Sequence, residues 1–416
     1  MRWLIVIRIV DAITGSGKSS WAIQDIIKKV KNGEKIIYVT PYLSEIERLK
    51  NECLKHNIIL EEPDARRGKG SKSKNLAQLM VLGKNIVTTH ACFDKVSREL
   101  LNEIVYLDYT LYMDEVHEVV AQYYLSDCDL EILENNKCIE IDNVSKRVVW
   151  KNPFYNGKFN DFKNLCDIGA IYYLSGSMYM WTFPHAVFAS MKNVYILTYL
   201  FKGQNQCHYY DLYNLCYNMC SIKNNTPNLR GMEADYELVE YDHKQYLEDI
   251  AKIKPLINIY DGNLNLDCNL SSYYLNNASD DDLKLVKNNV SNYFKNIIKG
   301  KSGENMWTTL LNYKHLLKGD GYTKGFIEIT ARATNAFAHK KNLAYVYDRF
   351  MNPVIYNFFK DKGITPKQDI YSASEIVQWV FRSAVRKGEE INIYIPSKRM
   401  RKIFIQWLNG ELIQEV

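Results

Sequence analysis

Short apolar runs alternate along this chain with longer segments in which apolar residues recur every three or four positions. The short runs predict buried strands, because they are continuous and rich in β-branched residues. The intervening segments predict helices. In the first half we expect strands at residues 3–10, 35–40, 85–90, 110–117 and 170–178, with helices at 18–33 and 44–56. This alternation is typical of a parallel sheet with crossover helices.

The second half repeats the alternation. Strands are predicted at residues 255–262, 325–330 and 391–396, and helices at 279–300, 372–388 and 397–410. Ser372 or Ser374 would cap the middle helix. The last helix gathers its apolar residues on one face, at Met400, Ile403, Phe404, Trp407 and Leu408. We therefore predict an α/β protein with domains at 1–205 and 236–416, joined by an irregular segment at 206–235.

Composition changes this picture little. The 416 residues carry 53 Lys and Arg against 48 Asp and Glu, a net charge of +5, which permits nucleic-acid binding without arguing for it. No apolar run is long enough for a transmembrane helix, so we expect no membrane partner. Nine cysteines without a regular frame suggest a reducing compartment. Cys207, His208, Cys216 and Cys220 form a candidate zinc set, but their spacing matches no common pattern, and a packed segment is the alternative.

The stretch "AITGSGKSS" (Ala12–Ser20) stands between the first strand and the first helix. Such a loop lets backbone N–H groups converge on a polyphosphate. We predict a nucleotide site made by Thr14, Gly15, Ser16, Gly17, Lys18, Ser19 and Ser20. Lys18 would reach the terminal phosphates and Ser19 would bind Mg²⁺. The strict pattern starts with Gly where this chain has Ala12, and a plain Gly/Ser turn is the alternative.

Two further elements would complete this site. The strand "LYMDEVH" ends in Asp114, a predicted Mg²⁺ ligand, and Glu115, which would orient or deprotonate the attacking water. In "VQWVFRSAVRKG", Gln378, Arg382 and Arg386 are spaced four apart, which on a helix places them on one face. The arginines could reach a γ-phosphate. A solvated basic stripe is the alternative.

Together these motifs resemble superfamily 2 helicases of the DEAD/DEAH-like (DExH) group, in what looks like a phage-encoded branch. "AITGSGKS" resembles motif I, where Ala is usual, "TPYLSEIERL" motif Ia, "VTTH" motif Ib, and "DEVH" motif II. "SGS" at 175–177 resembles motif III, "ITARATN" stands in the place of motif V, and "QWVFRSAVR" resembles motif VI with its second arginine one residue late. The resemblance implies two RecA-like domains, Mg²⁺ and ATP in the cleft between them, and a nucleic-acid strand across both. Too few residues precede motif I for the family's usual adenine contact.

Nucleic-acid contacts are expected from two groups of residues. The Gly/Ser-rich loop "RRGKGSKSK" offers Arg66, Arg67 and Lys69, which suit phosphates, although a mobile solvated loop is the alternative. Thr40, Pro41, Thr88, Thr89 and His90 stand at strand ends, where hydroxyl and amide groups can hold phosphates.

The sequence thus predicts a Mg²⁺-dependent ATPase that moves along or unwinds nucleic acid, with DNA favoured over RNA. Its partners would be replication or recombination proteins in the cytoplasm of a bacterial host. The alternatives are an ATP-gated clamp or recruitment switch without unwinding, a packaging motor, and a P-loop kinase.

Overall fold

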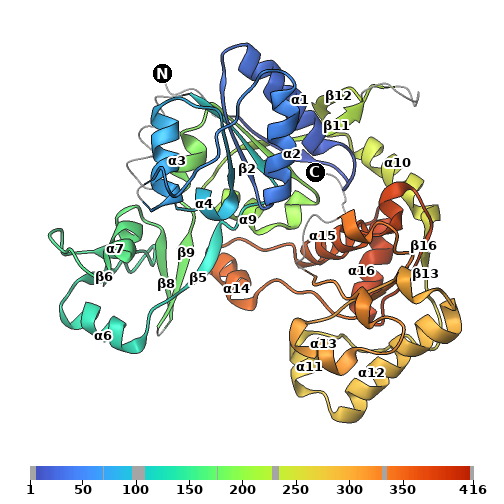
Figure 1. Cartoon of the computed structure of the whole chain (residues 1–416). Coiled ribbons are helices and arrows are strands. Elements are labelled where there is room, and N and C mark those ends of the chain that lie inside the picture. Colours follow the sequence, from blue (N-terminus) through green and yellow to red (C-terminus); the bar gives the residue numbers. More distant parts are fainter. Residues whose placement is uncertain are drawn as a thin grey trace. The chain divides into compact units, whose positions relative to one another are not determined.

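The computed structural model describes residues 6–68, 70–95, 108–175, 177–226, 234–329 and 335–412 (Figure 1). The chain forms two compact units. The first comprises Met1–Asp11, Gly17–Glu240 and Asn352–Pro366, and the second comprises Ala12–Ser16, Tyr241–Met351 and Lys367–Val416. No helix in the described part of the chain is long and apolar enough to span a bilayer.

A seven-stranded sheet forms the centre of the first unit, in the order β12-β11-β1-β10-β4-β2-β3. All neighbours are parallel except β11 and β12. The strands are β1 (Val6–Asp11), β2 (Lys35–Thr40), β3 (Ile86–Thr89), β4 (Tyr109–Asp114), β10 (Asn193–Thr198), β11 (Tyr217–Asn224) and β12 (Tyr236–Glu240).

The central strands β2, β4 and β10 are buried on both faces, to which successive residues of a strand point alternately. On one side, Val10, Ile36 and Tyr38 pack with α1 (Lys18–Lys31) and α2 (Leu43–Leu54). On the other side, Ile9 and Ile37 pack with a second set of helices. These are α3 (Lys72–Val81), α4 (His90–Phe93), α8 (Ala186–Ala189), α9 (Asn205–Leu212) and α14 (Pro353–Asp361). This burial explains why the sequence shows continuous apolar runs.

Residues 120–181 form an insert with a small core of its own. Its three-stranded antiparallel sheet has the order β5-β9-β8 and comprises β5 (Val120–Tyr124), β8 (Ile171–Ser175) and β9 (Met178–Thr182). The remaining elements are α6 (Asp127–Asn135), β6 (Ile139–Ile141), β7 (Val148–Trp150) and α7 (Asn160–Asp167). The strand predicted at 170–178 therefore exists in part, but it is not a strand of the parallel sheet.

The second unit has a four-stranded parallel sheet in the order β13-β16-β15-β14. Its strands are β13 (Ile257–Ile259), β14 (Asn305–Thr308), β15 (Asn342–Tyr345) and β16 (Ile391–Tyr394). Its helices are α10 (His243–Ile253), α11 (Ser272–Asn277), α12 (Asp280–Asn292), α13 (Lys314–Leu317), α15 (Gln368–Val380) and α16 (Lys398–Leu408). The α/β prediction with mostly parallel sheets is confirmed.

Two predictions for the second unit are wrong. Within the expected strand at 325–330, the described residues, 325–329, form one isolated bridge, Trp307 to Phe326, while β14 and β15 were not predicted. The helix expected at 372–388 starts at Gln368, so Ser372 and Ser374 lie inside it rather than at its cap.

The compact units also differ from the predicted domain boundaries. β12 pairs with β11 and so belongs to the sheet of the first unit. α14 (orange in Figure 1) lies beside β5 and places Phe358 and Phe359 in the core of the first unit. Tertiary packing has therefore drawn a segment from the C-terminal half into the first unit.

Candidate nucleotide-binding site

The phosphate loop lies where β1 gives way to α1. Gly15 and Gly17 have φ of 90° and 99°, a left-handed conformation that favours glycine. Among the described residues no side chain caps the N-terminus of α1, which begins at Lys18. A Cβ placed on Gly17 would lie 2.2 Å from Cε1 of Tyr236. The bare helix start and its glycines fit an anion site, because helix N-termini attract phosphates.

Asp11 is the last residue of β1 and stabilises the end of this strand immediately before the loop. Its two carboxylate oxygens accept hydrogen bonds from the backbone N–H groups of Leu200 and Phe201, each at 2.9 Å. Burial raises the pKa of Asp11 to about 6, although both hydrogen bonds oppose the rise. This residue, which no motif indicated, fixes the loop after β10 against β1.

Asp114, at the end of β4, lies close to the hydroxyl groups of two predicted site residues, Ser19 and Thr40. Its Oδ1 lies 3.5 Å from Ser19 Oγ and its Oδ2 lies 3.4 Å from Thr40 Oγ1. Only 9% of Asp114 is exposed, and burial, together with the charge of Glu115, raises its pKa to about 7. Oxygens at such spacings suit a hard cation, since neighbouring ligands of octahedral Mg²⁺ lie about 3 Å apart. The residues present therefore fit the predicted magnesium ion.

Glu115 follows in an unusual backbone conformation. Its φ is 67°, and its N–H donates to the carbonyl of Leu197 at 2.9 Å. A non-glycine residue in this region is strained, and such strain often occurs at functional sites. This strained residue directly follows Asp114, the predicted metal ligand.

Two histidines lie beside these carboxylates. His90 Nε2 is 3.0 Å from the carbonyl oxygen of Asp114. The buried ring of His117 lies 5.0 Å from the ring of His90, and its Nε2 is 2.5 Å from Asp94 Oδ1. The histidine of "DEVH" is thus an interior residue that anchors the segment after Glu115.

The residues predicted at strand ends for nucleic acid are mostly engaged within the fold. Thr40 and Thr88 are buried, and Thr40 contacts Asp114. The hydroxyl of Thr89 caps α4 by accepting from Cys92 N at 3.3 Å. Pro41 is half-buried. Their role toward nucleic acid remains a prediction, whereas the contact between Thr40 and Asp114 relates Thr40 to the metal site.

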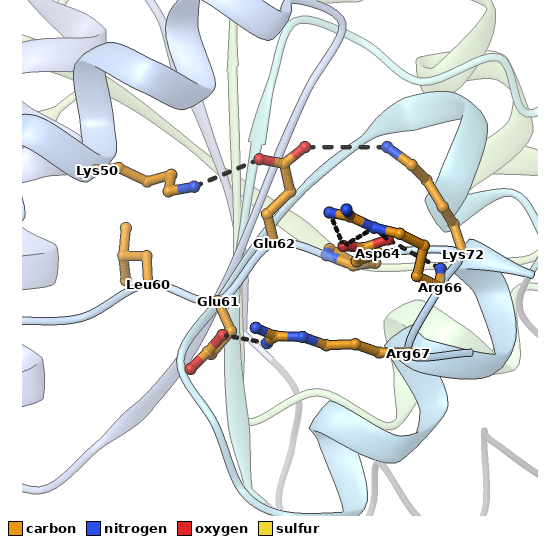
Figure 2. Close-up of a pocket in the computed structure, with 9 residues that line it drawn as sticks. Lys50, Leu60, Glu61, Glu62, Asp64, Arg66, Arg67 and Lys72 are labelled. Atoms are coloured by element: carbon orange, nitrogen blue, oxygen red, sulfur yellow. Dashed lines mark hydrogen bonds and ion pairs between the residues drawn. The ribbon is translucent and has the colours of Figure 1, made fainter. Parts of the chain in front are cut away.

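The basic loop lines a pocket of about 440 Å³ whose cations face carboxylates (Figure 2). Arg66 pairs with Asp64 at 2.8 Å and Arg67 with Glu61 at 3.7 Å. Glu62 lies 3.4 Å from Lys50 and 3.9 Å from Lys72. Lys69 lies outside the described residues. The loop is therefore partly neutralised, which its basic sequence alone did not indicate.

The second unit carries the predicted arginines, but not on one helical face. α15 ends at Val380, and residues Ala384–Lys387 form a 3-10 turn, so the spacing of Gln378, Arg382 and Arg386 does not align them. Arg382 is only 7% exposed, and its Nη1 donates to the carbonyls of Glu328 and Ile329. Arg386 is exposed and Gln378 half-buried. The residues Thr330–Thr334 of "ITARATN" lie outside the described part.

The segment assigned to motif III, residues 175–177, begins in the insert rather than in the parallel sheet. Ser175 ends β8 in the antiparallel insert sheet, and Gly176 lies outside the described residues. β10 instead lies between β1 and β4, so its end reaches the same edge as the phosphate loop and Asp114. Thr198 ends this strand with its hydroxyl buried and without a hydrogen-bond partner among the described residues. This hydroxyl is a site candidate that the sequence analysis missed.

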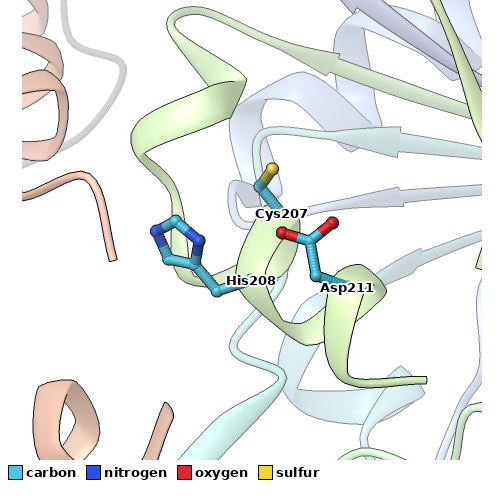
Figure 3. Close-up of side chains that lie close together, drawn as sticks. All are labelled: Cys207, His208 and Asp211. Carbon is cyan, nitrogen blue, oxygen red and sulfur yellow. The ribbon is translucent and has the colours of Figure 1, made fainter. Parts of the chain in front are cut away.

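The structure brings together only two residues of the predicted zinc set, Cys207 and His208, in the cluster that the described residues form. Cys207 and His208 on α9 lie close to Asp211, with donor atoms within 4.8 Å of one another (Figure 3). Cys216 and Cys220 are not part of this cluster. Cys207 Sγ also lies 3.3 Å from the hydroxyl of Tyr217. The spacing i, i+1, i+4 on one helix explains the grouping, and three donors are fewer than the four of a structural zinc site.

Comparison with known proteins identifies relatives of the whole chain. Two family models match: the YonV middle domain at residues 120–181, which is the insert, and the YonV C-terminal Rossmann-like domain at residues 251–408. A "SPbeta prophage-derived uncharacterized protein YonV" from Bacillus subtilis (strain 168) is 36% identical over 420 residues, covering 97% of this chain and 99% of the relative.

Solved structures of low sequence identity also superpose on the chain. One titled "XPD_Helicase" is 11% identical, with a TM-score of 0.44, and the match covers 99% of this chain and 95% of that one. A "DUF1998 helicase MrfA bound to DNA and AMPPNP" is 13% identical, with a TM-score of 0.35, covering 97% of this chain and 48% of that one. The full-length sequence match shows that the chain belongs to the YonV family.

Proposed function

We propose that this protein is a Mg²⁺-dependent ATPase that couples hydrolysis to movement along, or unwinding of, nucleic acid, with DNA favoured over RNA. The observation that carries the proposal is the meeting of Ser19 and Asp114 at the end of β4, beside a phosphate loop with left-handed glycines. Burial raises the pKa of this carboxylate to about 7, and a bound cation would favour its ionised form. A phosphate loop with such a carboxylate is the arrangement that binds Mg²⁺ and a triphosphate.

Each residue has a distinct part in this proposal. Lys18 and the N–H groups at the start of α1 hold the β- and γ-phosphates. Mg²⁺, bound by Ser19 and Asp114, would neutralise charge that develops on the phosphates. Glu115 orients the attacking water and accepts its proton. Arg382 and Arg386 would stabilise charge on the γ-phosphate as it is transferred, and Gln378 keeps its predicted catalytic part.

Nucleotide hydrolysis tests the first half of the proposal. Lys18→Ala should abolish hydrolysis, because the side chain is a phosphate ligand, and Glu115→Gln should bind ATP but hydrolyse it at least 100-fold more slowly, within the usual range for a lost general base. Lys31→Ala is the matched control, since it removes an exposed lysine from the far end of α1. Wild-type turnover in a folded Lys18→Ala protein would refute the nucleotide site.

Nucleic-acid coupling requires a separate experiment. ATPase rates without polymer and with single-stranded DNA, duplex DNA or RNA identify the activating polymer. Strand displacement with the preferred polymer then distinguishes a helicase from an ATP-gated clamp. Hydrolysis that no polymer stimulates would contradict the motor proposal while leaving the ATPase intact.

A further inference from the structure

The insert and the segment after α14 bring together a group of cations. Two of them, Arg147 and Lys362, hydrogen-bond neutral partners, whereas local hydrogen bonds and then the charge of Lys146 lower the pKa of Asp142. We call this group the Tyr172 cluster, comprising Lys146, Arg147, Lys362 and the ring of Tyr172. Cζ of Arg147 lies 5.6 Å, and Nζ of Lys362 lies 4.9 Å, from the centroid of the Tyr172 ring. Lys362 comes from the segment after α14, more than 200 residues away in sequence, and belongs to the same compact unit. The fold, rather than the sequence, brings these charges together.

Hydrogen bonds fix the two inner cations in place. Arg147 Nε donates to the hydroxyl of Tyr172 at 3.1 Å, and Lys362 Nζ donates to the carbonyl of Ser145 at 2.6 Å. The Tyr172 hydroxyl lies 3.0 Å from that of Tyr213. These partners are neutral, so they satisfy donors without cancelling charge. Both cations are half-buried, which positions them at the surface with their stems packed.

Two other cations of the insert form ion pairs with carboxylates. Lys151 pairs with Glu140 and Lys158 with Asp129, each at 2.7 Å. For Arg147 and Lys362, no carboxylate of the described chain lies within the 4.0 Å of an ion pair. Burial, and next the charge of Arg147, lower the pKa of Lys362, and the nearby Asp361 does not offset them. Like charges that lie close together raise the free energy of the folded protein, and a bound anion would lower it.

We propose that the Tyr172 cluster is a phosphate-binding site that holds the backbone of a nucleic-acid strand on the insert. A planar guanidinium beside an ammonium group is a typical phosphate-binding pair. His185 stacks on Tyr213 at 4.4 Å, and burial and Arg147 lower its pKa, so it adds no charge at neutral pH. The proposal rests on the proposed function, because that function supplies a polymer of phosphodiesters as the ligand.

Salt-dependent binding of a fluorescent single-stranded 20-mer tests this site. The double variant Arg147→Gln, Lys362→Gln keeps polar side chains and removes both charges. The slope of log K against log salt should become shallower by about 0.7 for each phosphate that the strand no longer places against a cation. The matched control is Lys151→Gln, Lys158→Gln, which removes two paired cations from the same insert and should leave the slope unchanged. Melting temperatures establish that both variants fold, and Tyr172→Phe, which removes only a hydroxyl, provides a milder perturbation.

The outcomes separate this proposal from the proposed function. An unchanged slope in the test variant, or an equal change in the control, overturns the phosphate site while polymer binding by the wild type stands. If the wild type binds no oligonucleotide with or without nucleotide, both proposals fail. If inorganic phosphate raises the melting temperature of the wild type but not of the double variant, and the oligonucleotide slope is unchanged, the ligand is a small phosphate compound, and the assignment to a strand is wrong.

Discussion

The replacement Asp114→Asn tests whether the buried, ionised carboxylate of Asp114 lowers the free energy of unfolding. Asp114 is buried at the end of β4, and its pKa rises from 3.8 to about 7, with burial as the largest cause and Glu115 as the next. Between these pH values the folded protein binds a proton that the unfolded chain releases. The free energy of unfolding therefore falls as the pH rises from about 4 to about 7.

The size of this effect follows from the pKa displacement. One pH unit corresponds to about 1.4 kcal/mol, so ionised Asp114 should cost the folded protein up to about 4 kcal/mol above pH 7. Asparagine has nearly the same shape and does not titrate. We therefore expect Asp114→Asn to be more stable than the wild type at pH 8, with the advantage disappearing near pH 4, while hydrolysis is abolished.

Urea titrations of both proteins at several pH values, without Mg²⁺, measure this difference. Adding Mg²⁺ at pH 8 should stabilise the wild type and not the variant, because only a carboxylate binds the ion. Asp129→Asn is a suitable control. Asp129 is half-buried, and its hydrogen bonds with Lys158 and Ser126 lower its pKa, so it should show no stability gain at pH 8. A difference between Asp114→Asn and wild type that does not change with pH would refute the reasoning.

Three further predictions concern the rest of the site. Gly17→Ala should weaken nucleotide binding at least tenfold in a titration, because φ of 99° costs a Cβ residue about 1–2 kcal/mol and the new methyl would meet Tyr236. Arg382→Ala should lower the free energy of unfolding by about 1–3 kcal/mol, since it leaves two carbonyls without their donor. Arg386→Ala, at an exposed position, should change it by less than about 0.5 kcal/mol. An Arg382→Ala protein as stable as the wild type would contradict the assigned contacts. Arg66→Ala with Arg67→Ala should flatten the salt slope of polymer binding by less than about 0.7, because both arginines already face carboxylates; a larger change would restore the loop to the main interface.

Sequence alone determined the elements whose signals are local. The buried strands β1, β2 and β4 are continuous apolar runs, and α16 buries all five residues of its predicted face. The turn at Gly15 and Gly17 and the helix start at Lys18 were predictable because their signal lies in adjacent residues, and nucleotide binding by this loop stays a prediction. Asp114 followed from its place at the end of an apolar strand.

Tertiary structure decided what depends on distant partners. β14 and β15 each begin with an asparagine, Asn305 and Asn342, and hydrogen bonding between these side chains across the ladder is invisible in a hydropathy pattern. β8 resembles a parallel strand in sequence, yet it pairs antiparallel in the insert, because apolar runs do not specify a partner. Lys50 and Arg147 are both basic residues in sequence. The fold places the carboxylate of Glu62 beside the first and a second cation, Lys362, beside the other. Charge neutralisation is a property of three-dimensional neighbours, and only the folded chain determines it.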